Sequence, residues 1–159
     1  MIVFIYGLDL SLSNSGVTIL DPDTYEPLYI GSISTKGDGT RGEKLKFIQE
    51  RFIELREKYP PSLIVLEKGF SKFNRETHAI QNVVGVVLCT LWKADFVEYM
   101  PTTVKAAIVH GKAKKELVRK VIQNRYPHIK FENTDESDSY AIVLTWLIKT
   151  KKIKWEKIG

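Results

Sequence analysis

The sequence predicts an α/β fold with a five-stranded mixed sheet flanked by helices. Residues 2–9 and 62–67 are nearly continuous apolar stretches that end in an acid, which is typical of strands buried on both faces. Two shorter stretches, 16–21 and 28–34, follow the first and are separated by an Asp-Pro-Asp turn at residues 21–23. We therefore expect an antiparallel meander of three strands and two further strands that run parallel to the first.

Helical periodicity fills the rest of the chain. Residues 41–58 place Leu45, Ile48, Phe52 and Leu55 on one face, and a Pro-Pro pair ends that helix. A further short strand is expected at 96–100. The other predicted helices span residues 76–93, 103–109, 112–125 and 135–149. In the first of these Gly85 would allow close packing, and Thr102 and Thr103 lie near the cap of the second.

Size and composition predict one domain spanning residues 1–159. No apolar run approaches the roughly 20 residues needed to cross a bilayer, and no basic region precedes the apolar N-terminus as in a signal peptide. The single cysteine, Cys89, lies in an apolar helical pattern and is expected in the core. A lone cysteine suits a reducing cytoplasm. The net charge of +5 says little by itself, but an acidic pocket on an otherwise basic chain suits a metal site that acts on a polyanion.

Four carboxylates are the candidate catalytic residues. Asp9 and Glu67 each end an apolar strand, where a buried charge is costly unless it is paired. If the two strands are parallel neighbours, both acids meet at the same sheet edge.

Asp135 and Asp138 lie three residues apart on one face of the last helix. Taken alone, each is also explained by the preference of acids for a first turn, and Thr134 or Asp135 could be the cap. Together the four acids offer the oxygen ligands that Mg²⁺ prefers. Two such ions about 4 Å apart can assist phosphodiester cleavage.

Four stretches of the chain carry a resemblance to a known family: Gly7-Leu8-Asp9-Leu10-Ser11 with Ser15-Gly16-Val17, Glu67-Lys68-Gly69-Phe70, residues 101–115, and Asp135-Glu136-Ser137-Asp138 with Tyr140-Ala141. Through these stretches, which run along nearly its whole length, the chain resembles the RuvC-type Holliday junction resolvases. It implies an RNase H-like fold, a homodimer and paired incisions across a four-way junction. It also implies that Asp9, Glu67, Asp135 and Asp138 bind two Mg²⁺ ions per site, with Mn²⁺ as a substitute.

The resemblance further places Phe70 against bases near the crossover and Lys105 and Lys115 near the scissile phosphates. Because the segment before residue 111 is about one residue shorter than in cellular members, Lys114 could take the place of Lys115. The chain is similar to the compact versions carried by bacteriophages, so the expected host is a bacterial or phage-infected cell. Substrates would then extend from four-way junctions to forks and flaps.

Basic and aromatic residues supply the predicted DNA contacts. The loop of Phe70, Lys72, Asn74 and Arg75 combines stacking and charged groups, and the 112–125 helix groups Lys112, Lys115 and Arg119 on one side, with Lys114 beside them. The alternative for these cations is a solvated helix face, which is also our expectation for Glu136. The basic segment 149–157 is expected to be frayed.

Three other functions compete with this prediction. An Asp at the end of a first strand also occurs in actin-like kinases, but these need glycine-rich phosphate turns and a second lobe. A non-catalytic protein that binds branched DNA gains nothing from four acids near a polyanion. An RNase H-fold nuclease acting on RNA or RNA–DNA hybrids has the same metal chemistry and stays open.

Overall fold

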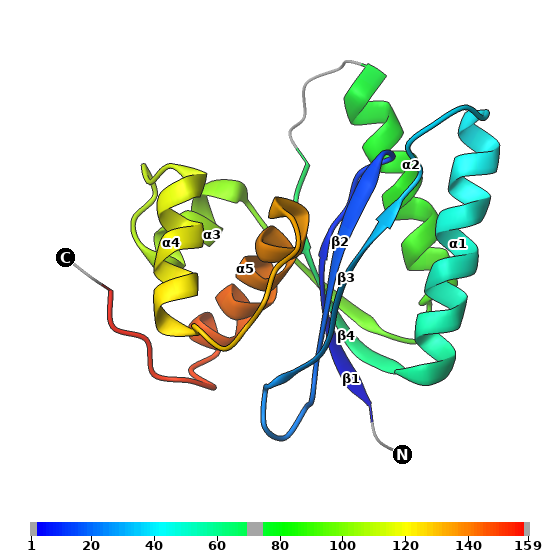
Figure 1. Cartoon of the computed structure of the whole chain (residues 1–159). Helices are drawn as coiled ribbons and strands as arrows, with labels where there is room; N and C mark the ends of the chain where they lie inside the picture. Colours follow the sequence, from blue (N-terminus) through cyan, green and yellow to red (C-terminus); the bar gives the residue numbers. More distant parts are fainter. Residues whose placement is uncertain (1–2, 70–74, 158–159) are drawn as a thin grey trace.

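A computed structural model describes residues 3–69 and 75–157. It contains a five-stranded sheet with the order β3-β2-β1-β4-β5. Strand β1 is antiparallel to β2 and parallel to β4, β2 is antiparallel to β3, and β4 is parallel to β5. Figure 1 shows α1 and α2 on one side of the sheet and α3, α4 and α5 on the other. The predicted mixed sheet, a meander joined to two parallel strands, is confirmed.

The elements follow the predicted order, with shifts at several ends. In chain order they are β1 (Phe4–Asp9), β2 (Asn14–Leu20), β3 (Pro27–Ser34), α1 (Arg41–Lys58), β4 (Pro61–Glu67), α2 (Arg75–Thr90), β5 (Asp95–Tyr99), α3 (Pro101–Ile108), α4 (Lys115–Arg125) and α5 (Thr134–Lys149).

Two predicted helix starts are wrong. Helix α3 begins at Pro101 after the N-cap Met100, without a side-chain cap from either threonine. Proline suits a first helical position because its fixed φ and missing N–H cost nothing there. Helix α4 begins at Lys115, so Lys112 precedes the helix instead of sharing a face with Arg119.

Alternation along the strands divides the core in two. Tyr6 and Leu8 of β1 face α1 and α2, where Ile48 and Phe52 of α1 are buried as predicted. Ile5 of β1 faces the layer of α3, α4 and α5. Because side chains alternate with a period of two, Gly7 and Asp9 lie on the same face as Ile5. Asp9 is therefore directed to the α5 side of the sheet.

Two glycines let α5 lie directly against the sheet. A Cβ on Gly7 would come within 2.5 Å of the Ser139 carbonyl oxygen, and one on Gly16 within 1.9 Å of the Asp135 carbonyl oxygen. Real Cβ atoms essentially never approach closer than 3.0 Å. Beside these glycines, the buried Thr18 and Ser139 hydroxyls form a 2.7 Å hydrogen bond between β2 and α5.

Helix α2 differs from its predicted packing. Cys89 is exposed, because the buried face of α2 carries Val83 and Val87 while Cys89 lies on the opposite face. A Cβ at Gly85 would meet nothing within 4 Å, so this glycine does not serve close packing within the chain. Among the described residues, no helix is both long and apolar enough to span a membrane.

The basic C-terminal segment is docked, contrary to the predicted fraying. The Trp155 indole donates a 3.0 Å hydrogen bond to the Ile108 carbonyl oxygen and stacks on Tyr126 at 6.3 Å between ring centroids. The Arg125 guanidinium lies 5.2 Å from the centre of the Trp155 ring. An apolar anchor in the segment therefore holds it against α3 and α4, which its high lysine content concealed.

Candidate functional site

Sheet register brings the two strand-end acids together. Leu8 of β1 pairs with Leu66 of β4 in the parallel ladder, so Asp9 and Glu67, the next residues, lie side by side at the carboxyl edge. Asp9 lies an even number of residues after Ile5 on β1, and Glu67 two residues after Val65 on β4, so both acids share the strand face that is turned to α5. The prediction that these acids share one sheet edge is confirmed.

Helix α5 carries the other two acids in its first turns. Asn133 caps the helix by accepting a 3.0 Å hydrogen bond from the Glu136 N–H. The Glu136 side chain accepts a 2.7 Å hydrogen bond from the Glu132 N–H and is only 3% exposed. Neither Thr134 nor Asp135 is the cap, and Glu136 is a buried capping residue, not the solvated residue we expected.

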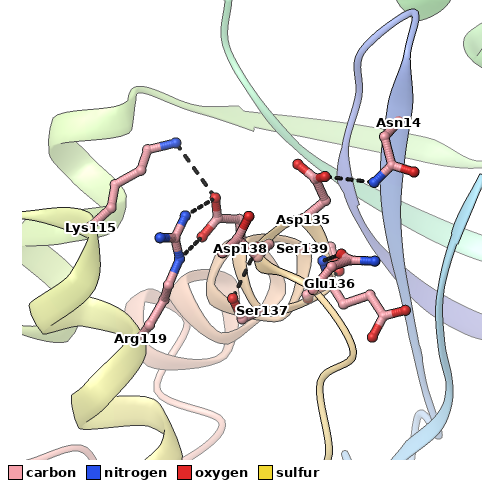
Figure 2. Close-up of polar contacts among 10 residues, drawn as sticks. Asn14, Lys115, Arg119, Asp135, Glu136, Ser137, Asp138 and Ser139 are labelled. Atoms are coloured by element: carbon pink, nitrogen blue, oxygen red, sulfur yellow. Dashed lines mark hydrogen bonds and ion pairs between the residues drawn. The ribbon is translucent and has the colours of Figure 1, made fainter. Parts of the chain in front are cut away.

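Asp135 and Asp138 are each held by a residue from another element (Figure 2). The Asn14 side-chain amide, from the start of β2, donates a 2.6 Å hydrogen bond to Asp135 Oδ2. The Arg119 guanidinium, from α4, donates to both oxygens of Asp138 at 3.1 and 3.0 Å. Lys115 Nζ lies 3.6 Å from Asp138 Oδ2. Asp135 is therefore held by β2 and Asp138 by α4, both at the N-terminal end of α5.

The acids are close enough to perturb one another. Burial, followed by the charges of Asp138 and Glu67, raises the pKa of Asp9 to about 7, with a smaller contribution from Asp135. Burial also raises the pKa of Glu67, although Lys115 opposes this effect. This is the electrostatic signature of carboxylates gathered in a site that a positive charge would stabilise.

Lysine side chains supply part of that positive charge. Burial lowers the pKa of Lys115, but the charges of Asp138, Glu67 and Asp9 outweigh it and raise that pKa overall. Lys105 of α3 lines two cavities together with Glu67 and Lys115. The larger of these cavities, about 550 Å³, is also lined by Asp9 and opens beside the carboxyl edge of the sheet.

The remaining predicted DNA contacts are exposed, are bound to Asp138, or lie outside the described residues. Arg75 is exposed at the start of α2, and Lys112 and Lys114 are exposed before and at the N-cap of α4. Arg119 is turned to Asp138 as described above. The predicted contacts Phe70, Lys72 and Asn74 lie outside the described residues.

Two residues of the site were not anticipated from the sequence. Asn14 contacts Asp135 across 121 positions of the chain, and no local pattern signals such a pair. Glu76, in the first turn of α2, lines the 550 Å³ cavity together with Lys105. An acid in a first helical turn is common enough to be attributed to the helix dipole.

The arrangement suits a cation by its donor chemistry, although no three His, Cys, Asp or Glu side chains in residues 3–69 and 75–157 enclose a single metal site as they stand. The acids offer hard oxygen donors only, which is the ligand type of Mg²⁺ and Mn²⁺. Burial first, and then the neighbouring acids Asp138 and Glu67, raise the pKa of Asp9, and a divalent cation would offset both effects by stabilising the charged carboxylate. Asp135 and Asp138 are at present engaged by Asn14 and Arg119.

Sequence comparisons identify the family of this chain. The family model described as crossover junction endodeoxyribonuclease RuvC matches residues 5–146. A protein of that name from Hydrogenovibrio crunogenus is 28% identical over 143 residues, which cover 86% of this chain and 83% of the relative. Another, from Rickettsia typhi, is 27% identical over 162 residues, which cover 94% of this chain and 99% of the relative.

Solved structures show the same fold. The RuvC of T. thermophilus, in complex with a Holliday junction substrate, has a TM-score of 0.80 at 18% identity and covers 94% of this chain and 96% of its own. The yeast mitochondrial Holliday junction resolvase Ydc2 gives 0.65 at 14% identity, with 93% and 79% covered. The RNase H-like fold implied by the resemblance is confirmed. The chain belongs to the RuvC family of crossover junction endodeoxyribonucleases.

Proposed function

We propose that this protein resolves Holliday junctions by hydrolysing phosphodiester bonds near the branch point, with Asp9, Glu67, Asp135 and Asp138 as its catalytic acids. One observation carries the assignment of the site. In a chain of the RuvC family, acids from β1, β4 and α5 lie near one sheet edge, where burial, and then the charges of Asp138 and Glu67, raise the pKa of Asp9 to about 7. We extend the substrates to other branched DNA, including forks and flaps.

The same four acids are proposed to hold two Mg²⁺ ions, for which Mn²⁺ substitutes. When bound, such ions lower the pKa of a coordinated water and neutralise charge on the leaving oxygen. The chain itself supplies the ligands and their placement. Asp9 and Glu67 are fixed by strand pairing, and Asn14 orients Asp135 through its 2.6 Å hydrogen bond.

Lys105 and Lys115 are proposed to contact the phosphates that flank the cut. Both line the cavities that contain Glu67, so they lie where a scissile phosphate has to enter to reach the acids. Lys112, Lys114 and Arg75 are exposed and would bind the DNA backbone farther out. Gly69, at the cavity wall, leads directly into the proposed base-contacting segment of Phe70, Lys72 and Asn74.

We further propose that two copies act together, because resolving a junction requires a cut in each of two strands. The support within the chain is a set of large apolar side chains that one copy leaves in solvent. Trp92, after α2, is 70% exposed and Phe96, on the edge strand β5, is 51% exposed. Sedimentation of the native protein should give twice the mass of one chain.

A cleavage assay tests the function directly. Native protein and Asp9→Asn are incubated with Mg²⁺ and labelled four-way junction, fork, RNA–DNA hybrid and linear duplex. We expect incision near the branch point by the native protein alone, with junction binding retained by Asp9→Asn. Equal cutting by the variant would reject the site. Preferential cutting of the hybrid would favour an RNA-directed nuclease, and binding without cutting an architectural protein.

A further inference from the structure

Arg119 donates hydrogen bonds to both carboxylate oxygens of Asp138, the last acid of the proposed site, and no other ion pair among the described residues has this two-bond contact. Its guanidinium takes both oxygens of Asp138 at 3.1 and 3.0 Å. We propose that Arg119 is a positioning residue that competes with the divalent cation for Asp138. Arg119 thereby sets the metal concentration at which the site becomes active. The inference rests on the proposed function of the four acids.

The geometry of the pair makes it strong. Two parallel N–H···O bonds between a guanidinium and a carboxylate are charge-assisted and fix the orientation of both groups. The side chains are only 26% exposed for Arg119 and 17% exposed for Asp138, so solvent screens the pair less than a surface ion pair. Any cation that binds Asp138 has to displace one of these two hydrogen bonds or use the carboxylate lone pairs that the Arg119 guanidinium leaves free.

Lys115 contacts the same acid but is placed differently. Its ammonium group is 3.6 Å from Asp138 Oδ2, and its pKa is also raised by Glu67 and Asp9. It is therefore a point charge shared by three acids, with half of its side chain exposed. Such a group can stay in the site and follow a phosphate when a cation arrives. Arg119, by contrast, is committed to one carboxylate.

Both the hydrogen bonds and the positive charge of Arg119 oppose the binding of a divalent cation at Asp138. Removing the guanidinium frees both Asp138 oxygens and deletes one positive charge next to the place where a cation would bind. Both changes favour the cation, since repulsion between it and Arg119 disappears as well. In the absence of metal the same change leaves Lys115 as the remaining cation beside Asp138 and removes both hydrogen bonds from Arg119, so the metal-free protein loses stability.

Metal binding without DNA tests the proposal. Mg²⁺ is titrated calorimetrically and Mn²⁺ by its free-ion resonance signal into the native protein, Arg119→Gln, Arg119→Lys and Lys120→Gln. Lys120 follows Arg119 on α4 and is exposed, so its change removes the same charge from the same helix. We expect about tenfold tighter metal binding for Arg119→Gln, an intermediate value for Arg119→Lys, and the native value for Lys120→Gln.

Two further readouts separate competition from a merely structural role. The Mg²⁺ concentration for half-maximal junction cutting should fall for Arg119→Gln by the same factor as the dissociation constant. Thermal denaturation should show a lower midpoint than native in a chelator and a larger rise on adding Mg²⁺. A destabilised fold alone would lower both midpoints equally and would weaken metal binding.

Several results would overturn the inference. Unchanged or weaker metal binding by a folded Arg119→Gln variant overturns it. Without metal, if Arg119→Gln loses as much junction affinity as Lys105→Gln, Arg119 is a phosphate contact and the inference is also overturned. Asp9→Asn distinguishes this failure from that of the proposed function. If Asp9→Asn weakens metal binding while Arg119→Gln leaves it unchanged, only the competition is refuted. If Asp9→Asn binds metal as the native protein does, the proposed site is refuted.

Discussion

Replacing Gly16 by alanine should displace the end of α5 that carries the proposed catalytic acids. Gly16 pairs with Asp9 in the sheet, and its Cβ would lie 1.9 Å from the Asp135 carbonyl oxygen and 2.4 Å from the carbonyl carbon. Since the contact has to open to at least 3.0 Å, α5 or β2 must move by about 1.1 Å. The clashing atoms are backbone atoms of a capped helix, so no flexible side chain can absorb the movement.

The expected cost has a structural and a catalytic part. Overpacking of this kind lowers the free energy of unfolding by about 1–3 kcal/mol, which corresponds to a melting point lower by roughly 3–10 °C for a chain of this size. A misplacement of about 1 Å in a catalytic group lowers kcat by about 10²-fold. Asp135 moves relative to Asp9, so we expect kcat for junction cutting to fall by that factor.

Thermal denaturation and single-turnover cutting of a labelled four-way junction at saturating Mg²⁺ measure the two parts. The matched control is Gly42→Ala, which adds the same methyl group at an exposed helical position of α1 where the nearest atom is 3.8 Å away. It should keep native cutting and gain up to about 1 kcal/mol of stability. Native kcat and melting point in Gly16→Ala would refute the close-approach argument.

The other predictions concern pH, the lysines and the C-terminal segment. Because the pKa of Asp9 rises from 3.8 to about 7 on folding, the folded protein retains a proton that the unfolded chain has lost between those values. The free energy of unfolding without metal should therefore fall as pH rises from about 4 to 7. Measured by urea denaturation, this free energy should depend less on pH in Asp9→Asn, and an unchanged pH dependence in the variant would contradict the raised pKa. Lys115→Gln should lower kcat by about 10²-fold, whereas Lys114→Gln should act on junction affinity; the reverse pattern would show that Lys114 is the residue near the scissile phosphate. Trp155→Ala should release the C-terminal segment, lower stability by about 2 kcal/mol and speed trypsin cleavage there. The control is Glu156→Ala, at an exposed position that leaves every trypsin site intact, and native resistance of Trp155→Ala to trypsin would show that the anchor is unimportant.

Local patterns were sufficient for the strands and for the helices that cover them. The apolar runs that end in Asp9 and Glu67 form β1 and β4, and the predicted apolar face of α1 is buried. These elements are predictable because burial imposes a period of two on a strand and about 3.6 on a helix. Helix ends were less predictable. At Lys115 the helix begins three residues later than the charge pattern indicated.

The sequence by itself singled out Asp9 and Glu67 at the ends of two apolar strands, and the family resemblance added Asp135 and Asp138 to the proposed site. Only the tertiary structure decided how these acids are held. Asn14 reaches Asp135 across 121 positions and Arg119 reaches Asp138 across 19, and neither distance corresponds to a helical or strand repeat. The same holds for Gly16, whose missing side chain matters only because Asp135 packs on it. Periodicity reports the environment of a residue, whereas a specific partner depends on how separate elements pack together.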